Sequence, residues 1–185
     1  MNNKGIWTLE EAKTGHIHSI LLAQGLAKLF DKAQPVYDLG CGTGFYARYL
    51  QQAGFDVRAF EPTEGIEEIA FFSPIERLDL SEEIKPGTYP RAQILCLEVG
   101  EHIPAEYEDI VLNNLWYLSD TDAYIVLSWA VPGQGGLGHV NEKPNNYIQL
   151  KMHERNRDYC HKQSEDLRAL AGKCWWFENT IMVFK

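Results

Sequence analysis

The sequence of 185 residues lacks several features that would define its class at once. No apolar run approaches the length of a membrane span, and the first residues carry no secretory signal. The four cysteines show neither C-x-x-C pairing nor zinc-site spacing, so we expect reduced thiols. Repeats, low-complexity tracts and linkers are also missing. These absences favour one cytoplasmic domain, residues 1–185, over a membrane, secreted or repeat protein.

Basic charge is also scarce. The 17 Lys and Arg residues stand against 26 Asp and Glu residues, which gives a net charge of −9. An acidic chain does not attract the phosphate backbone of nucleic acids, so a nucleic acid partner is disfavoured. The composition gives no indication of the oligomeric state.

The chain does contain a glycine loop between an apolar strand and a helix. Residues 36–44 read V-Y-D-L-G-C-G-T-G, with glycines at alternate positions after Asp38. Such glycines let the backbone turn tightly and approach a ligand closely. The dinucleotide pattern G-x-G-x-x-G/A needs Gly or Ala where Phe45 stands, and a P-loop needs Gly-Lys-Ser/Thr after Gly44. Both phosphate-binding patterns therefore fit poorly.

The D-x-G-x-G-x-G pattern resembles motif I of the class I S-adenosylmethionine (SAM)-dependent methyltransferases. This resemblance implies that SAM is the cofactor and that the loop packs against its methionine part. The loop residues concerned are Gly40, Cys41, Gly42 and Gly44. The resemblance also implies that Asp38 reaches the amino group of SAM.

Three later segments extend the resemblance. Glu61 closes the second apolar strand about 20 residues after the first glycine, where it can accept hydrogen bonds from both ribose hydroxyls. In the family an aspartate after the third strand accepts from the adenine amino group, which implies this role for Asp79, beside Leu80. The stretch E-V-G-E-H-I-P at 98–104 looks like the E-V-x-E-H-[IV]-P segment after strand four, and it implies a methionine contact for Glu98.

The acceptor side has fewer signals. Methyl transfer needs alignment and exclusion of water, and a general base only where the acceptor must lose a proton. Glu101, His102 and His139 are the catalytic candidates. The glycine-rich loop that contains His139 follows the fifth strand, where the family places substrate contacts, so His139, Asn141 and Trp7 are the candidates for acceptor binding. Alternatively, the histidine and asparagine only fold the loop through hydrogen bonds.

The spacing of Glu98, Glu101 and His102 also resembles the divalent-metal site of small-RNA 2′-O-methyltransferases and ubiquinone-pathway O-methyltransferases, with His139 as a further ligand. Such a site could lower the pKa of an acceptor hydroxyl. The same spacing occurs in methyltransferases without a metal. A metal site is therefore an alternative, and a metal-free reaction is our expectation.

The apolar pattern alternates strands with helices, which predicts an α/β, doubly wound, Rossmann-like sheet. The expected strands are 36–39, 57–61, 74–79, 93–97, 123–129, 158–161 and 177–184, and the expected helices are 17–30, 44–53, 64–69, 104–118 and 144–155. Ser164 is expected to cap a further helix that ends at Gly172. The resemblance implies the methyltransferase fold, whose seven-stranded, mostly parallel sheet ends in an antiparallel C-terminal strand.

Within that fold, residues 1–33 would be an N-terminal extension and helix, 34–130 the SAM-binding core, and 131–185 the acceptor-side loop and C-terminal elements. The leading interpretation is a SAM-dependent methyltransferase that transfers to an oxygen or nitrogen of a small-molecule acceptor. One alternative is an RNA or protein methyltransferase with a divalent metal site. A second is a SAM-binding module that has lost transfer.

Overall fold

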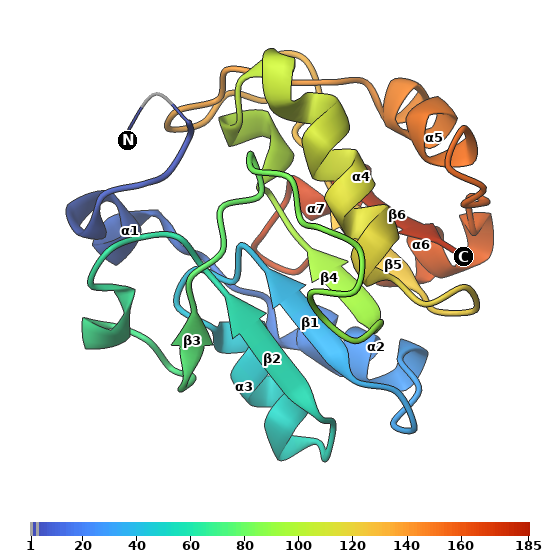
Figure 1. Ribbon diagram of the computed structural model, residues 1–185, viewed down its shortest axis with the longest axis horizontal. Coiled ribbons are helices and arrows are strands. Elements are labelled where there is room, and N and C mark those ends of the chain that lie inside the picture. The colour runs from blue at the N-terminus through green and yellow to red at the C-terminus, as the bar shows by residue number, and fades with distance from the viewer. Residues whose placement is uncertain (1, 3) are drawn as a thin grey trace.

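The computed structural model describes residue 2 and residues 4–185, which are built around one sheet (Figure 1). In the described part of the chain the sheet has six strands in the order β3-β2-β1-β4-β5-β6. They are β1 (Val36–Leu39), β2 (Val57–Phe60), β3 (Ile75–Glu76), β4 (Gln93–Cys96), β5 (Ile125–Ser128) and β6 (Ile181–Phe184). All neighbours are parallel except β6, which runs antiparallel to β5. The predicted mostly parallel, Rossmann-like sheet with an antiparallel C-terminal strand is confirmed.

The central strands are buried on both faces. Every residue of β1, β4, β5 and β6 is buried, as expected for strands that read as continuous apolar runs. In the register of the sheet, Leu39 lies opposite Phe60. The residues that follow these two, Gly40 and Glu61, therefore leave the sheet at the same edge.

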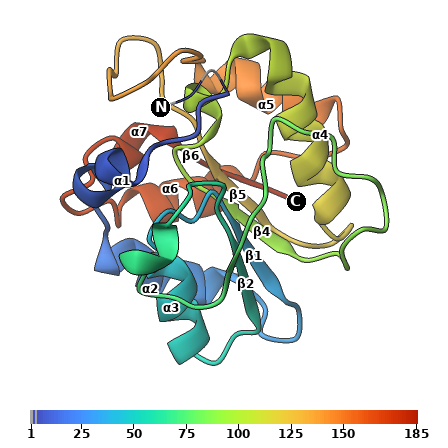
Figure 2. The same cartoon turned by 60° about the vertical axis from the view of Figure 1, so that its left-hand side comes forward.

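Helices cover the sheet on two sides (Figure 2). One face carries α4 (Glu108–Leu118) and α5 (Asn145–His153), and the other carries α2 (Ile20–Leu29), α3 (Phe45–Gln52) and α6 (His161–Arg168). Successive strand residues point to opposite faces, so Ile94 packs in the cluster with Leu112 of α4 while Leu95 packs in the cluster with Leu26 of α2. Two apolar cores thus hold the sheet between helical layers.

The N-terminal region contains one helix more than the pattern predicted. Helix α1 (Leu9–Gly15) begins at a capping box, in which Thr8 Oγ1 accepts from the backbone N–H of Glu11 and the Glu11 carboxylate accepts from that of Thr8. The expected helix at 17–30 is shorter, because Ser19 caps α2 by accepting from the N–H of Leu22 over 3.2 Å.

The C-terminal region differs more from expectation. Residues 158–161 form a single bridge, Tyr159 to Phe184, instead of a strand, so the sheet has six strands and not seven. The predicted strand at 177–184 starts as a helical turn, α7 (Phe177–Thr180), whose sequence F-E-N-T is mostly polar, and the apolar run I-M-V-F that forms β6 begins only at Ile181.

The predicted cap at Ser164 is wrong. The N-cap of helix α6 is Cys160, four residues before Ser164, so the helix begins at His161, and it ends at Arg168 instead of Gly172. Ser164 lies inside the helix, where its hydroxyl donates to the Cys160 carbonyl and accepts from the N–H of Val183 in β6. The hydroxyl that suggested a cap therefore ties α6 to the sheet.

The remaining elements are short. Turns of 3₁₀ helix lie at Ile66–Glu68, Gly100–His102 and Ala105–Tyr107, and the last of these leads into α4. The edge strand β3 has only two residues, whereas 74–79 were expected. In the described ranges no helix combines the length and apolar character needed to cross a bilayer.

Candidate functional site

A cavity of about 410 Å³ lies beyond the carboxyl ends of β1, β2 and β4. Four further segments complete its walls: the N-terminal stretches 4–7 and 15–18, the loop 134–139, and residues 175–177. Open α/β sheets bind ligands in the crevice at this edge, and small-molecule sites measure roughly 300–1,000 Å³. Position and size therefore make this cavity the candidate site.

The glycine loop forms one wall. The N–H groups of Gly40 and Cys41 donate to the Phe60 carbonyl over 2.9 and 3.0 Å, and Gly40 has a φ of 69°. A Cβ at Gly40 would lie 2.4 Å from Cγ2 of Val99, and one at Gly42 would lie 2.1 Å from Nε2 of His16. Both positions favour glycine, because each has a positive φ and a side chain packed where a Cβ would lie.

Asp38, on the same wall, is a buried carboxyl group that lacks a hydrogen-bond partner at one oxygen. The residue is 4% exposed, lines the cavity, and has no hydrogen-bond partner at Oδ2 among the described residues. Burial raises the pKa of the Asp38 carboxyl to about 7, and the charge of Glu61 acts in the same direction. A buried carboxylate with a free oxygen is costly unless a cation or donor reaches it. Asp38 therefore offers a place for a cationic group.

Glu61 braces the loop. Its Oε2 accepts from the N–H of Gly42 over 2.9 Å, and its Oε1 accepts from the N–H and hydroxyl of Thr63 over 3.1 and 2.7 Å. A carboxylate has about four acceptor positions, so one remains for a ligand at this cavity-lining residue. The donors fix the orientation of the Glu61 carboxylate at the end of β2.

Asp79 and Leu80 line the cavity beside β2. Oδ1 of Asp79 accepts from the N–H and hydroxyl of Ser81 over 2.9 and 2.7 Å. Oδ2 lies 3.3 Å from Nζ of Lys4, which also contacts Glu82 at 2.8 Å. The N-terminal segment is thereby tied across this end of the cavity.

Glu98 lies directly beyond β4 in an unusual backbone conformation, with a φ of 53°. Its Oε2 accepts from Nε2 of Gln134 over 2.8 Å, and its Oε1 accepts from the hydroxyl of Thr180 over 3.3 Å. The backbone N–H of Glu98 donates to Oγ of Ser128. A non-glycine residue at positive φ is uncommon, and these hydrogen bonds hold Glu98 in this conformation at the cavity wall.

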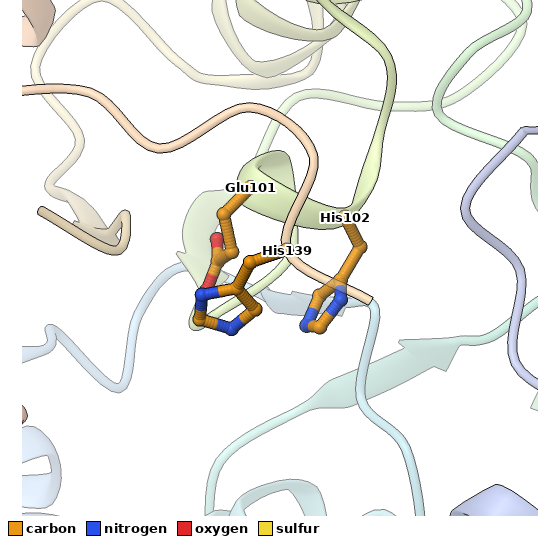
Figure 3. Close-up of side chains that lie close together, drawn as sticks. All are labelled: Glu101, His102 and His139. Atoms are coloured by element: carbon orange, nitrogen blue, oxygen red, sulfur yellow. The ribbon is translucent and has the colours of Figure 1, made fainter. Parts of the chain in front are cut away.

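Glu101, His102 and His139 come together next to Glu98. Figure 3 shows the three side chains directed toward a common space, and one polar atom of each lies within 4.8 Å of the others. Glu101 is fully buried, and neither of its carboxylate oxygens has a hydrogen-bond partner in the described residues. Burial, followed by the charge of Glu98, raises the pKa of Glu101 well above its usual range, which favours the protonated acid.

His102 is held from two directions. Nε1 of Trp7 donates to Nδ1 of His102 over 3.4 Å, and the two rings meet edge to face with centroids 5.2 Å apart. Burial, followed by the neighbouring ring of His139, lowers the pKa of His102 to about 4. The imidazole is therefore neutral at physiological pH.

His139 packs edge to face on His102, with ring centroids 4.9 Å apart. Its Nδ1 lies 3.1 Å from Oε1 of Glu142, which also accepts from the N–H of Gly135, while Oε2 accepts from that of Gly133. The Gly133 bond, and then the His139 and Gly135 bonds, lower the pKa of Glu142. An ionised Glu142 thus orients the imidazole of His139 within the loop.

Not every predicted site residue lines the cavity. Asn141 is buried, its Nδ2 donates to Oε2 of Glu108 over 3.3 Å, and its carbonyl accepts from Nε1 of Trp129 over 2.7 Å. These bonds direct Asn141 into the protein interior. Gly42 and Gly44 also stand outside the lining; Gly42 contacts it through His16, and Gly44 precedes α3. Trp7 and Cys41 do line it.

Sequence reasoning missed several residues of this site. His16, His18 and Gln134 line the cavity without belonging to any recognisable motif. His18 stacks on Phe45 with centroids 4.5 Å apart, and burial lowers its pKa to about 4. Glu142 had a detectable signal, since an acid three residues after a histidine in a glycine-rich loop can orient that histidine.

Comparison with known proteins finds similarity in structure alone. No protein-family description and no curated protein matched the chain. A TehB-like SAM-dependent methyltransferase from Corynebacterium glutamicum has a TM-score of 0.65 and 14% identity, over 95% of this chain and 92% of that protein.

Two further structures have the same architecture. Magnesium protoporphyrin IX methyltransferase from Synechocystis, crystallised with bound SAH, has a TM-score of 0.56 and 21% identity over 76% of this chain and 71% of its own. A protein from an antibiotic biosynthesis pathway of Anabaena variabilis has a TM-score of 0.61 and 16% identity over 78% of this chain, which spans 64% of that protein's length. The chain therefore has the fold of the class I SAM-dependent methyltransferases.

Proposed function

We propose that this protein is a SAM-dependent methyltransferase that transfers a methyl group to an oxygen or nitrogen of a small-molecule acceptor. The observation that carries the proposal is Asp38, a buried carboxylate with an unpaired oxygen at the wall of the cavity. The amino group of SAM is a cation of the kind this oxygen lacks. The likeness to a methyltransferase crystallised with SAH supports the same assignment.

The remaining wall residues fit the same ligand. Gly40 lines the cavity, where its backbone can pack against an extended ligand chain, and Glu61 keeps an acceptor position for a hydroxyl. When bound, SAM supplies a methyl group already activated by its positive sulfur. The protein then has to align the acceptor and exclude water, and the segments that enclose the cavity do both.

An apolar mouth supports a small organic acceptor. Ile17, Leu137 and Trp175 are 47%, 57% and 57% exposed, and all three line the cavity. Exposed apolar side chains that converge on a cavity are covered when an apolar ligand binds. The net charge of −9 works against a nucleic acid acceptor.

The residues proposed for a divalent metal are a poor fit in this arrangement. Both carboxylate oxygens of Glu98 already accept hydrogen bonds, and Nδ1 of His102 accepts from Trp7. Glu101, His102 and His139 each place one possible ligand atom within 4.8 Å of the others, but burial favours the protonated form of Glu101, which is not a metal ligand. The proposed reaction therefore contains no metal step.

Isothermal titration with SAM and with S-adenosylhomocysteine tests the proposal. We expect micromolar binding of both, loss of binding in Asp38→Ala and Glu61→Ala, and no binding of NADH. Asp56→Ala is the matched control, because this exposed carboxylate lies just before β2, at the opposite end of the strand from Glu61. Failure of the wild-type protein to bind either sulfur ligand would contradict the proposal. Binding without transfer to any acceptor would favour the SAM-binding module.

A further inference from the structure

The hydrogen-bond partners of His139 determine which of its ring nitrogens is free. Glu142 is ionised and can only accept, so the proton of a neutral His139 ring must reside on Nδ1, 3.1 Å from Oε1. Nε2 then carries a lone pair, and no described residue hydrogen-bonds to it. This atom lies beside the backbone of Gly136, which also lines the cavity. His139 therefore presents a proton acceptor to the site.

His102 has the opposite arrangement. The indole N–H of Trp7 can only donate, so Nδ1 of His102 is the acceptor and the proton resides on Nε2. His102 therefore keeps no free lone pair, and its contacts with Trp7 and His139 connect the N-terminal segment to the loop that carries His139.

Glu101 is also unsuited to accept a proton. It is the third titratable group facing His139, besides His102 and Glu142, and its buried carboxyl favours the protonated form. A protonated carboxyl has no tendency to remove a proton from a substrate. Of the three clustered side chains, only His139 combines a free lone pair with access to the cavity.

We propose that His139 is the proton acceptor of the transfer reaction, that Glu142 is the positioning residue that fixes its tautomer, and that the acceptor substrate is an uncharged hydroxyl compound with an apolar, phenol-like body. This inference rests on the proposed methyltransferase function. A hydroxyl on an aromatic ring needs to lose its proton to become a good nucleophile, whereas a neutral amine already carries a lone pair. The apolar side chains Ile17, Leu137 and Trp175 provide the surface for such a body.

The step balances with the groups named. The acceptor oxygen forms a bond to the methyl carbon, and the carbon–sulfur bond breaks with its electron pair remaining on sulfur. The hydroxyl proton passes to Nε2 of His139, which becomes an imidazolium beside the carboxylate of Glu142. Opposite charges at 3.1 Å stabilise this imidazolium, and its proton leaves to water after product release.

Nitrogen-15 spectra of the imidazole rings test the tautomers without any acceptor. We expect the Nδ1–H form for His139 and the Nε2–H form for His102 in the spectra of the wild-type protein recorded at alkaline pH. In Glu142→Gln the side chain amide can donate as well as accept, so we expect the Nδ1–H form of His139 to lose population. An Nε2–H form of His139 in the wild-type protein would overturn the inference.

The exposed pair His153 and Asp158 provides a matched control. Nδ1 of His153 lies 3.2 Å from Oδ1 of Asp158, outside the cavity lining. Asp158→Asn removes a histidine–carboxylate contact of the same kind, and His153→Gln removes an imidazole ring. Because this pair lies outside the cavity, neither variant should change the spectrum of His139 or the transfer rate.

Transfer is tested with SAM labelled with carbon-13 on the methyl group and a small-molecule extract as the source of acceptors. The carbon shift of the product distinguishes a methoxy group, which supports the inference, from an N-methyl group, which overturns it. With the methoxy-forming acceptor, we expect His139→Gln to lower kcat by about 10²–10⁴-fold with unchanged SAM affinity. Its pH–rate profile should also lose the wild-type rise, and Glu142→Gln should show a smaller loss of the same kind.

The outcomes separate this inference from the function on which it rests. If the protein binds SAM and forms a methoxy product, but wild type and His139→Gln have equal kcat, the role of His139 is overturned while the proposed methyltransferase function is retained. No SAM binding by the wild-type protein would overturn the proposed function itself. Melting curves of both variants, compared with the wild type, identify any loss of kcat that is caused by unfolding.

Discussion

Replacing Asp38 with asparagine should make the folded protein more stable at alkaline pH while it removes SAM binding. Burial raises the pKa of Asp38 from its ordinary value of 3.8 to about 7, so the folded state holds the charged form unfavourably. One pKa unit corresponds to about 1.4 kcal/mol at 25 °C, and the difference between 3.8 and about 7 therefore corresponds to about 4 kcal/mol. This value is an upper limit, because the buried amide of asparagine also costs free energy.

The sign of the pH dependence follows from the direction of the pKa change. Between pH 4 and pH 7 the unfolded chain releases the Asp38 proton while the folded protein keeps it, so the free energy of unfolding falls as pH rises. Above pH 7 both states are ionised and the loss is complete. The variant lacks this titration. The stability difference in its favour should therefore grow between pH 4 and pH 7 and stay constant above pH 7.

Urea unfolding followed by tryptophan fluorescence at several pH values between 4.5 and 8.5 measures this difference, since the chain has five tryptophans. Titrations of all other groups occur in both proteins and cancel in the comparison. The control Asp56→Asn alters an exposed carboxylate and should run parallel to the wild type. Parallel curves for wild type and Asp38→Asn would refute the reasoning. So would a variant that is less stable than the wild type at pH 8.

Three further changes have defined outcomes. Gly42→Ala should cost about 1–2 kcal/mol from the φ of 53°, more if His16 cannot move, and should weaken SAM binding in titration calorimetry. Asn141→Ala should lower the free energy of unfolding by about 1–3 kcal/mol in urea, because Glu108 loses a buried donor; an increased KM for the acceptor would contradict its interior placement. Transfer measured with EDTA should equal transfer measured with Mg²⁺, and a strong dependence on added metal would restore the metal site.

The sequence predicted the strands of the sheet well where their apolar runs were continuous. Strands at 36–39 and 93–97 were found within one residue of the expected ends, because parallel strands buried on both faces have few alternatives. The C-terminal part was harder, since the expected strand joined the polar stretch E-N-T after Phe177 to the apolar run that begins at Ile181, and only the second part forms a strand. The role of Ser164 depended on its contact with Val183, and such a long-range bond has no local pattern.

The candidate site was predictable where it follows from the strand ends. Asp38, Glu61 and Glu98 come directly from the sheet, so their places in the sequence determined their place at the cavity. The loop around His139 was different, because its hydrogen bonds to Glu142 and the burial of Asn141 depend on how the chain folds back after β5. Sequence spacing indicates which residues share a loop, but it does not indicate which of them face inward.

Several unfavourable features of the structure lie in or next to the cavity wall. Asp38 has an unpaired buried oxygen, Glu101 has two, and Glu98 carries its side chain on a backbone with positive φ. Groups of this kind lower the stability of the folded protein, and they persist where a function requires them. For Asp38 the cost is about 4 kcal/mol when ionised, and a bound cation would offset it.

The pKa of Asp38 should therefore fall when SAM binds, so that binding near pH 6 releases a proton and weakens as the pH decreases. Titration calorimetry in two buffers of different ionisation enthalpy measures this proton. Its absence would mean that Asp38 does not contact the cationic part of the ligand.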